Sequence, residues 1–168
     1  MPLWLIGMMG SGKTEVGARL ASRAGSEFLD TDRMVENEVQ SSVAEIFSTE
    51  GELAFRWREK QAVRKAANHM DAVVATGGGV VMDSDNVATM RGSGPVIWLQ
   101  ADPVVLAGRV GIGAARPLLE GNPVERLASI LQERSNAYEE AADHVVVTDR
   151  ADIEQVVVLV EELWNASS

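Results

Sequence analysis

A run of eight residues near the amino terminus has the residue types and spacing of a phosphate-binding loop. It reads Gly7-Met8-Met9-Gly10-Ser11-Gly12-Lys13-Thr14 and fits the pattern G-x-x-x-x-G-K-[ST]. In such a loop backbone N–H groups surround phosphate oxygens, the lysine reaches the β and γ phosphates, and the threonine hydroxyl can ligate Mg²⁺. The spacing predicts a nucleoside triphosphate site; the alternative is a glycine-rich turn that carries a surface lysine.

Two aspartates, Asp30 and Asp32, follow the short apolar run Phe28–Leu29. In an extended backbone their side chains would point the same way, into the crevice where open α/β sheets bind ligands. One carboxylate could organise a metal ion while the other orients or deprotonates an attacking hydroxyl, as phosphoryl transfer requires. The alternative is that Asp32 only caps the next helix.

Glycines and charged residues form two further patterns. Thr76 precedes three glycines, Gly77–Gly79, whose backbone N–H groups could approach a ligand closely, although a simple turn is equally compatible. Arg56 and Glu59 are three residues apart on a predicted helix and share a face. That spacing suits a carboxylate that holds a guanidinium in place, and it also suits a solvated surface ion pair.

Two arginines fall in or after a long loop that is rich in glycine and proline. Arg116 lies inside the loop, which runs from about 111 to 123, and Arg134 lies in the helix expected next. A mobile arginine in such a loop could close over transferring phosphates. Without further context, both arginines would be interpreted as solvated surface residues.

An alternating series of strands and helices must position these residues. Short apolar runs predict strands at Leu3–Ile6, Phe28–Leu29, Ala72–Ala75, Pro95–Leu99 and His144–Val147. Helical periodicity predicts helices over about Val16–Ala24, Met34–Val39, Gly51–His69, Asp102–Val110, Val124–Ala142 and Asp152–Trp164. Apolar strands that alternate with helices are typical of a parallel sheet covered by helices on both faces.

Composition narrows the class of protein. A length of 168 residues is most simply one domain, 1–168. A net charge of −10 disfavours binding to nucleic acids and anionic membranes. The absence of cysteine excludes disulfides and thiolate chemistry, and cytoplasm is the expected compartment. The apolar start, Met1–Met9, lacks the basic residues and cleavage site of a signal peptide and is too short to span a bilayer.

Together, and in this order, the patterns resemble the shikimate kinase family over nearly the whole chain. The resemblance rests on the phosphate loop, Leu29-Asp30-Thr31-Asp32, Ile46-Phe47 with Glu50-Gly51-Glu52, Phe55-Arg56 with Glu59, Gly77-Gly78-Gly79, Arg116-Pro117-Leu118-Leu119 and Arg134 followed by Tyr138. It implies a P-loop kinase fold: a three-layer α/β/α domain with a five-stranded parallel sheet. A further likeness to nucleoside monophosphate kinases implies the strand order 2-3-1-4-5. A substrate region near 33–60 and a lid near 111–123 are expected.

The resemblance also implies an activity, the transfer of the γ-phosphoryl group of ATP to the 3-hydroxyl of shikimate on the route to chorismate and aromatic amino acids. Lys13, Asp32 and Arg116 would be catalytic, with Asp32 beside the accepting hydroxyl. The shikimate site would comprise Asp32, Arg56, Glu59, Gly77, Gly78, Gly79 and Arg134, with Phe47 and Phe55 as an apolar wall. Both Arg56 and Arg134 would bind the carboxylate of shikimate, because a planar carboxylate suits guanidinium partners.

On the nucleotide side, the resemblance places ATP against Gly10, Ser11, Gly12, Lys13, Thr14, Glu15, Arg109, Arg116 and Arg150. Mg²⁺ would be held by Thr14 and Asp30, directly or through waters, while Arg109 and Arg150 would flank the adenine. The only partners expected are the small molecules shikimate and ATP, and the chain is expected to be a monomer, since no helix shows an unexplained second apolar face.

Two positions depart from the family pattern. Glu15 stands where many members carry a second hydroxyl near the α-phosphate, and a carboxylate there would repel nucleotide unless it swings to solvent. Asp152 lies close to where a proline often frames adenine. A gluconate kinase and a nucleotide-binding switch module are the rival functions. The two carboxylate-binding arginines disfavour the first, and the retention of Asp30, Asp32 and Arg116 disfavours the second.

Overall fold

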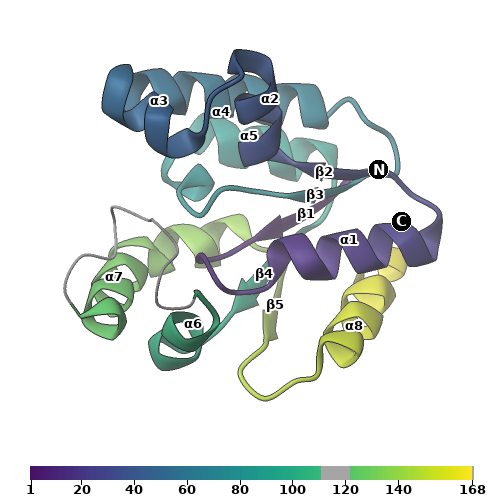
Figure 1. Cartoon of the computed structure of the whole chain (residues 1–168). Helices are drawn as coiled ribbons and strands as arrows, with labels where there is room; N and C mark the ends of the chain where they lie inside the picture. Colours follow the sequence, from purple (N-terminus) through teal and green to yellow (C-terminus); the bar gives the residue numbers. More distant parts are fainter. Residues whose placement is uncertain (111–121, 168) are drawn as a thin grey trace.

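The computed structural model describes residues 1–110 and 122–167, in which strands and helices alternate around one sheet (Figure 1). The strands are β1 Leu3–Ile6, β2 Phe28–Asp30, β3 Val73–Ala75, β4 Val96–Gln100 and β5 His144–Val147. The helices are α1 Lys13–Ala24, α2 Thr31–Val39, α3 Val43–Thr49, α4 Glu52–Ala66, the 3₁₀ turn η1 Val80–Met82, α5 Ser84–Ser93, α6 Pro103–Val110, α7 Pro123–Ala141 and α8 Ile153–Ala166.

The five strands form a single parallel sheet in the order β2-β3-β1-β4-β5, which confirms the predicted fold class and strand order. Strand β1 lies at the centre, where Trp4 pairs with Val74 of β3 and Val96 of β4. The carboxyl ends of parallel strands meet at one edge, where ligands bind in open α/β sheets. Asp30 ends β2 at that edge, and the phosphate loop and the Gly77–Gly79 loop follow β1 and β3 there.

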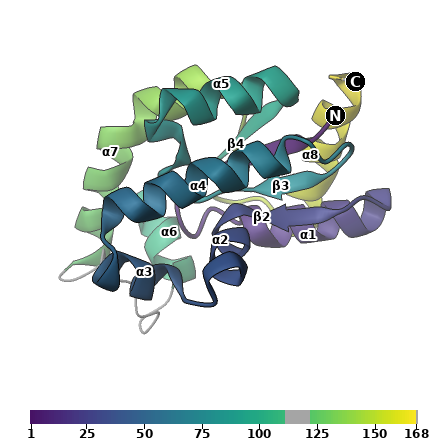
Figure 2. The ribbon, with the colours of Figure 1, turned by 90° about the horizontal axis from the view of Figure 1, so that it is seen from above.

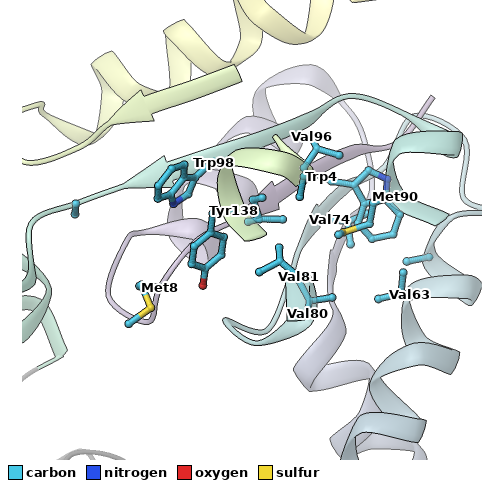
Figure 3. Packing of buried hydrophobic residues seen from close by; sticks show 14 of the residues in the cluster. Trp4, Met8, Val63, Val74, Val80, Val81, Met90, Val96, Trp98 and Tyr138 are labelled. Carbon is cyan, nitrogen blue, oxygen red and sulfur yellow. The ribbon is translucent and has the colours of Figure 1, made fainter. Parts of the chain in front are cut away.

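Alternating residues of the strands build two cores, one on each face of the sheet. Leu3 and Leu5 pack under α1 and α8, whereas Trp4 and Ile6 belong to a second core with α4, α5 and α7. Figures 1 and 2 show these two helical layers on opposite sides of the strands, and Figure 3 shows part of the second core. This three-layer packing holds the loops at the carboxyl edge against a rigid frame.

Helices α2, α3 and α4 have a small core of their own. Val35, Ile46, Phe55 and Ala62 form it, each at most 4% exposed. Three of these four residues fall within 33–60, the range predicted as the substrate region. Within the described ranges, no helix is long and apolar enough to cross a bilayer.

Several local predictions need correction. Helix α4 ends at Ala66 rather than His69, and strand β3 begins at Val73 rather than Ala72. The helices α3 and α5 were not predicted, because Val43–Thr49 is short and Ser84–Ser93 has little apolar periodicity. The lid predicted near 111–123 lies outside the described residues apart from its last two, where Asn122 caps α7.

Candidate active site

The phosphate loop joins the end of β1 to the first turn of α1. Lys13 is buried, and its Nζ donates to the backbone carbonyls of Gly7 and Met8, at 2.8 and 2.9 Å. The hydroxyl of Ser11 is also buried and has no hydrogen-bond partner among the described residues. A buried hydroxyl of this kind is a ready donor for an anionic oxygen, and the amino end of α1 adds partial positive charge.

The Asp30 carboxylate, at the end of β2, accepts two sets of hydrogen bonds. Its Oδ1 accepts from the backbone N–H groups of Asp32 and Arg33, so Asp30 is the N-cap of α2. Its Oδ2 accepts from the Thr14 hydroxyl at 3.1 Å. The predicted extended geometry over Asp30 and Asp32 is therefore wrong, because α2 already begins at Thr31. The capping alternative was assigned to the wrong aspartate, since Asp30 rather than Asp32 provides the cap.

Asp32 and Glu59 each present one buried oxygen without a partner. Asp32 Oδ1 and Glu59 Oε1 have no hydrogen-bond partner within the described part of the chain. Both lie against Gly77, because a Cβ built there would be 2.6 Å from the first oxygen and 2.8 Å from the second. A side chain at position 77 would displace these carboxylates, so the glycine keeps them in place. The site therefore contains two adjacent acceptors that can bind hydrogen-bond donors of a ligand.

Burial and neighbouring charges change the acidity of this carboxylate pair. Burial raises the pKa of Asp32 to about 6, and the negative charges of Asp30 and Glu59 add to the effect. Burial also raises the pKa of Glu59, although the adjacent Arg56 opposes the shift. A carboxylate with a pKa near 6 is well matched to accept a proton near neutral pH.

Arg56 and Glu59 form a partly buried pair, in which Glu59 is buried, rather than the solvated surface ion pair that was the alternative. Arg56 Nη1 lies 2.8 Å from Glu59 Oε2, and the Glu59 side chain is 1% exposed. Glu52 also contacts the guanidinium of Arg56. A Cβ at Gly79 would lie 2.6 Å from that guanidinium, so a side chain there would displace Arg56. Burial of Glu59 therefore depends on Arg56, since an unpaired buried charge is strongly unfavourable.

Arg134 reaches the same site from α7 through the carbonyl of Gly78. Arg134 Nη1 donates to Gly78 O at 3.0 Å, and the Tyr138 hydroxyl donates to the same oxygen at 2.5 Å. Tyr138 is fully buried and stacks on Trp98, with ring centroids 5.2 Å apart (Figure 3). The role of Tyr138 was not predicted, although its spacing of four residues from Arg134 puts both side chains on one helix face.

One cavity of about 1140 Å³ connects these groups. Phe47 and Phe55 form part of its wall, with ring centroids 4.8 Å apart, as expected for an apolar wall. The predicted site residues that line it are Gly10, Ser11, Gly12, Lys13, Thr14, Glu15, Asp30, Asp32, Phe47, Phe55, Arg56, Glu59, Gly77, Gly78, Gly79, Arg109 and Arg134. Residues dispersed from 10 to 134 are thus brought together.

The cavity also extends toward the ends of α6 and β5. Arg109 lies there and donates to the hydroxyl and the carbonyl of Thr148, and Thr148 lines the cavity as well. Arg150 is exposed and does not line the cavity, so the structure does not support its predicted contact with a base. Asp152 lines the cavity and caps α8. Arg116 lies outside the described residues.

The residues predicted for Mg²⁺ fit such an ion. Thr14 Oγ1 and Asp30 Oδ2 are within hydrogen-bond distance, and hydroxyl and carboxylate oxygens are the donors that Mg²⁺ prefers. The described residues contain no cluster of three or more acidic, histidine or cysteine side chains that could enclose a metal. Two protein oxygens are sufficient, because Mg²⁺ usually keeps several waters and binds substrate phosphates.

The fold and the site define a class. A phosphate loop after the central strand of a parallel sheet, an acceptor pocket lined by carboxylates and arginines, and a shared cavity are the features of a P-loop phosphotransferase.

Comparison with known proteins defines the family. The family model described as shikimate kinase matches residues 9–164. A shikimate kinase of Symbiobacterium thermophilum is 45% identical over 96% of this chain and 95% of its own length. One from Streptomyces coelicolor is 41% identical over 90% of this chain and 88% of its own. The chain belongs to the shikimate kinase family, which confirms that part of the sequence-based interpretation.

Solved structures of shikimate kinases agree with this family membership. A shikimate kinase from Acinetobacter baumannii in complex with shikimate superposes with a TM-score of 0.93 at 31% identity, covering 98% of this chain and 93% of that one. The shikimate kinase from Aquifex aeolicus gives a TM-score of 0.83 at 29% identity, covering 99% of this chain and 98% of that one.

Proposed function

We propose that this chain transfers the γ-phosphoryl group of ATP to the 3-hydroxyl of shikimate, giving shikimate 3-phosphate and ADP. The observation that carries the proposal is that cationic donors and carboxylate acceptors lie together at one end of the cavity. Two arginines, Arg56 and Arg134, line the cavity together with Asp32 and Glu59. Each of these carboxylates has one buried oxygen without a hydrogen-bond partner among the described residues. A ligand with one carboxylate and several hydroxyl groups satisfies both sets, because carboxylates accept from guanidinium groups and hydroxyls donate to carboxylates.

The transfer uses groups from both sides of the cavity. The oxygen of the acceptor hydroxyl forms a bond to the γ-phosphorus while the bond to the bridging oxygen of ADP breaks. Asp32 accepts the proton of the hydroxyl, and Lys13 neutralises charge on the phosphates. Mg²⁺, held by Thr14 and Asp30, supplies charge neutralisation for the triphosphate when bound. Arg116 is proposed to act on the transferring phosphoryl group, and a fall in kcat of Arg116→Ala would support this role.

The decisive experiment measures ADP release from Mg-ATP by the purified chain with shikimate, with gluconate or without an acceptor, each with and without EDTA. We expect ADP only with shikimate and only without EDTA. The Lys13→Ala protein, purified in the same way, controls for a contaminating kinase. ADP release only with gluconate would favour a related sugar-acid kinase. ATP binding without any turnover would favour a nucleotide-dependent switch.

We also propose that the chain works as a single-domain monomer in the cytoplasm and that it needs no macromolecular partner. Static light scattering at micromolar concentration tests the monomer, and a mass of twice 18.1 kDa would contradict it.

A further inference from the structure

Glu15 brings a carboxylate to a place where phosphates are to bind. It lies in the first turn of α1, directly after Thr14, and lines the same cavity as Lys13. Its Oε1 accepts from Arg19 Nη2 at 2.8 Å, one helical turn further on. Arg19 Nη1 donates to Glu154 in the first turn of α8. The Glu15 carboxylate is therefore tied back along α1, in the direction of α8.

We propose that Arg19 is a positioning residue for the nucleotide, which holds and neutralises the Glu15 carboxylate so that the first turn of α1 can accept phosphates. The inference rests on the proposed function, in which ATP lies along the phosphate loop. Arg19 does not itself line the cavity, so its effect would pass through Glu15.

The electrostatic reason is that a carboxylate and a phosphate compete for the positive amino end of α1. The amino end of α1 favours an anion, and an unrestrained carboxylate in its first turn would compete with phosphate for that charge or repel it directly. Glu154 and Asp152 add negative charge at the nearby start of α8. Without Arg19, the pair of Glu15 and Glu154 would lose the cation that both contact. A triphosphate would then approach an uncompensated acidic surface.

The chain offers a matched control. Arg23 and Glu161 form a second ion pair between α1 and α8, with Arg23 Nε 2.8 Å from Glu161 Oε2, and neither residue lines the cavity. Loss of Arg23 therefore removes the same kind of contact between the same two helices without freeing a carboxylate beside the phosphates. Any effect that comes only from the packing of α1 on α8 should appear in both arginine variants.

The test is the dissociation constant of ADP, measured by isothermal titration calorimetry at low salt for five proteins: wild type, Arg19→Gln, Glu15→Gln, the Arg19→Gln/Glu15→Gln double variant and Arg23→Gln. We expect Arg19→Gln to weaken ADP binding about five-fold. The double variant should return to within about two-fold of wild type, and Arg23→Gln should stay within about two-fold. In turnover assays, Arg19→Gln should raise the KM for ATP and leave kcat and the KM for shikimate unchanged.

Three results with the variants would overturn the inference. If the double variant binds ADP as weakly as Arg19→Gln, Arg19 acts as a cation in its own right and not through Glu15. If Arg23→Gln is equally weakened, the effect is structural, and if Arg19→Gln binds normally, Glu15 needs no restraint. Because ADP binding needs no acceptor, a failure of shikimate-dependent turnover would overturn the substrate and leave this comparison intact. A wild-type protein that binds no ADP would overturn both.

Discussion

The two ends of the cavity are built in different ways. At the acceptor end, which comprises Asp32, Arg56, Glu59, Gly77–Gly79 and Arg134, charged groups from three helices are wholly or partly buried, and each lies against the glycine loop. At the end predicted to hold the base, called the base end, the cavity is lined by Arg109, Thr148 and Asp152. Arg109 is exposed and donates to the buried Thr148, and Arg150 is exposed and does not line the cavity. Burial makes each acceptor-end group depend on its neighbours, whereas solvent replaces lost partners at the base end.

This contrast predicts that the effects of substitutions fall steeply from one end to the other. The largest effect is expected at Asp32. Asp32→Asn should lower kcat by about 10²- to 10³-fold, because the amide cannot accept the proton of the hydroxyl, while the KM for shikimate stays within about ten-fold. Steady-state kinetics with varied shikimate measure both constants, and an unchanged kcat would remove Asp32 from the mechanism.

The same residue gives a pH dependence whose sign follows from its raised pKa. With a pKa of about 6, wild-type Asp32 becomes protonated as the pH falls through that value, so kcat should decrease below pH 6. The effect of pH on stability has the opposite sign. Between pH 3.8 and about 6 the folded state keeps this proton while the unfolded state has lost it, so the contribution of Asp32 to stability falls as the pH rises through this window. The buried charge destabilises the folded state above that window. Asp32→Asn should therefore stabilise the chain by about 2 kcal/mol at pH 8 and not at pH 3.5; thermal melts at both values provide the check.

The next effect is expected at the ion pair of Arg56 with the buried Glu59. Arg56→Met leaves Glu59 buried without its cation, which should destabilise the chain by about 3 kcal/mol and raise the KM for shikimate at least about ten-fold. In the Arg56→Met/Glu59→Gln double variant the unpaired charge is gone, so denaturant unfolding should show most of the stability restored. The weak shikimate binding should remain. A double variant as unstable as the single one would show that packing, not charge, is lost.

The same contrast explains which features of the site could be predicted from the sequence. Arg56 with Glu59, and the three glycines from Gly77, could be predicted because each pattern lies within four residues of sequence. The burial of Glu59 beside Arg56 could not be predicted from the sequence, because it depends on the packing of α4 against the loop after β3. The carbonyl of Gly78, which accepts from Tyr138, is a contact across 60 residues that no local spacing encodes.

The aspartate pair shows the limit of assuming an extended backbone. Asp30 and Asp32 were correctly placed at the carboxyl edge, but the helix begins at Thr31, three residues before the predicted start near Met34. The side chain of Asp30 then caps α2 and still meets Thr14, which a strand geometry does not anticipate. The parallel sheet and its two helical layers were predictable because they follow from five apolar strands and their alternation with helices. The strand order came only from the likeness to nucleoside monophosphate kinases.

A smaller effect is expected at Arg109. Arg109→Ala removes the two donors to Thr148 and one cation that lines the cavity, so the KM for ATP should rise about five-fold with kcat within about two-fold of wild type. Arg109→Lys should recover part of the loss, because it keeps the charge but not the forked geometry. A change in the KM for shikimate would contradict the separation of the two ends.

The smallest effect is expected at Arg150, where the family resemblance and the structure disagree. The resemblance places Arg150 beside the adenine, yet its side chain is exposed and does not line the cavity. If Arg150 stays exposed when nucleotide is bound, Arg150→Ala should leave the KM for ATP, the KM for shikimate and kcat within about two-fold of wild type. A rise in the KM for ATP as large as that of Arg109→Ala would show that Arg150 turns inward when nucleotide binds. The base end would then be assembled by its ligand, whereas the acceptor end is fixed by burial before any ligand arrives.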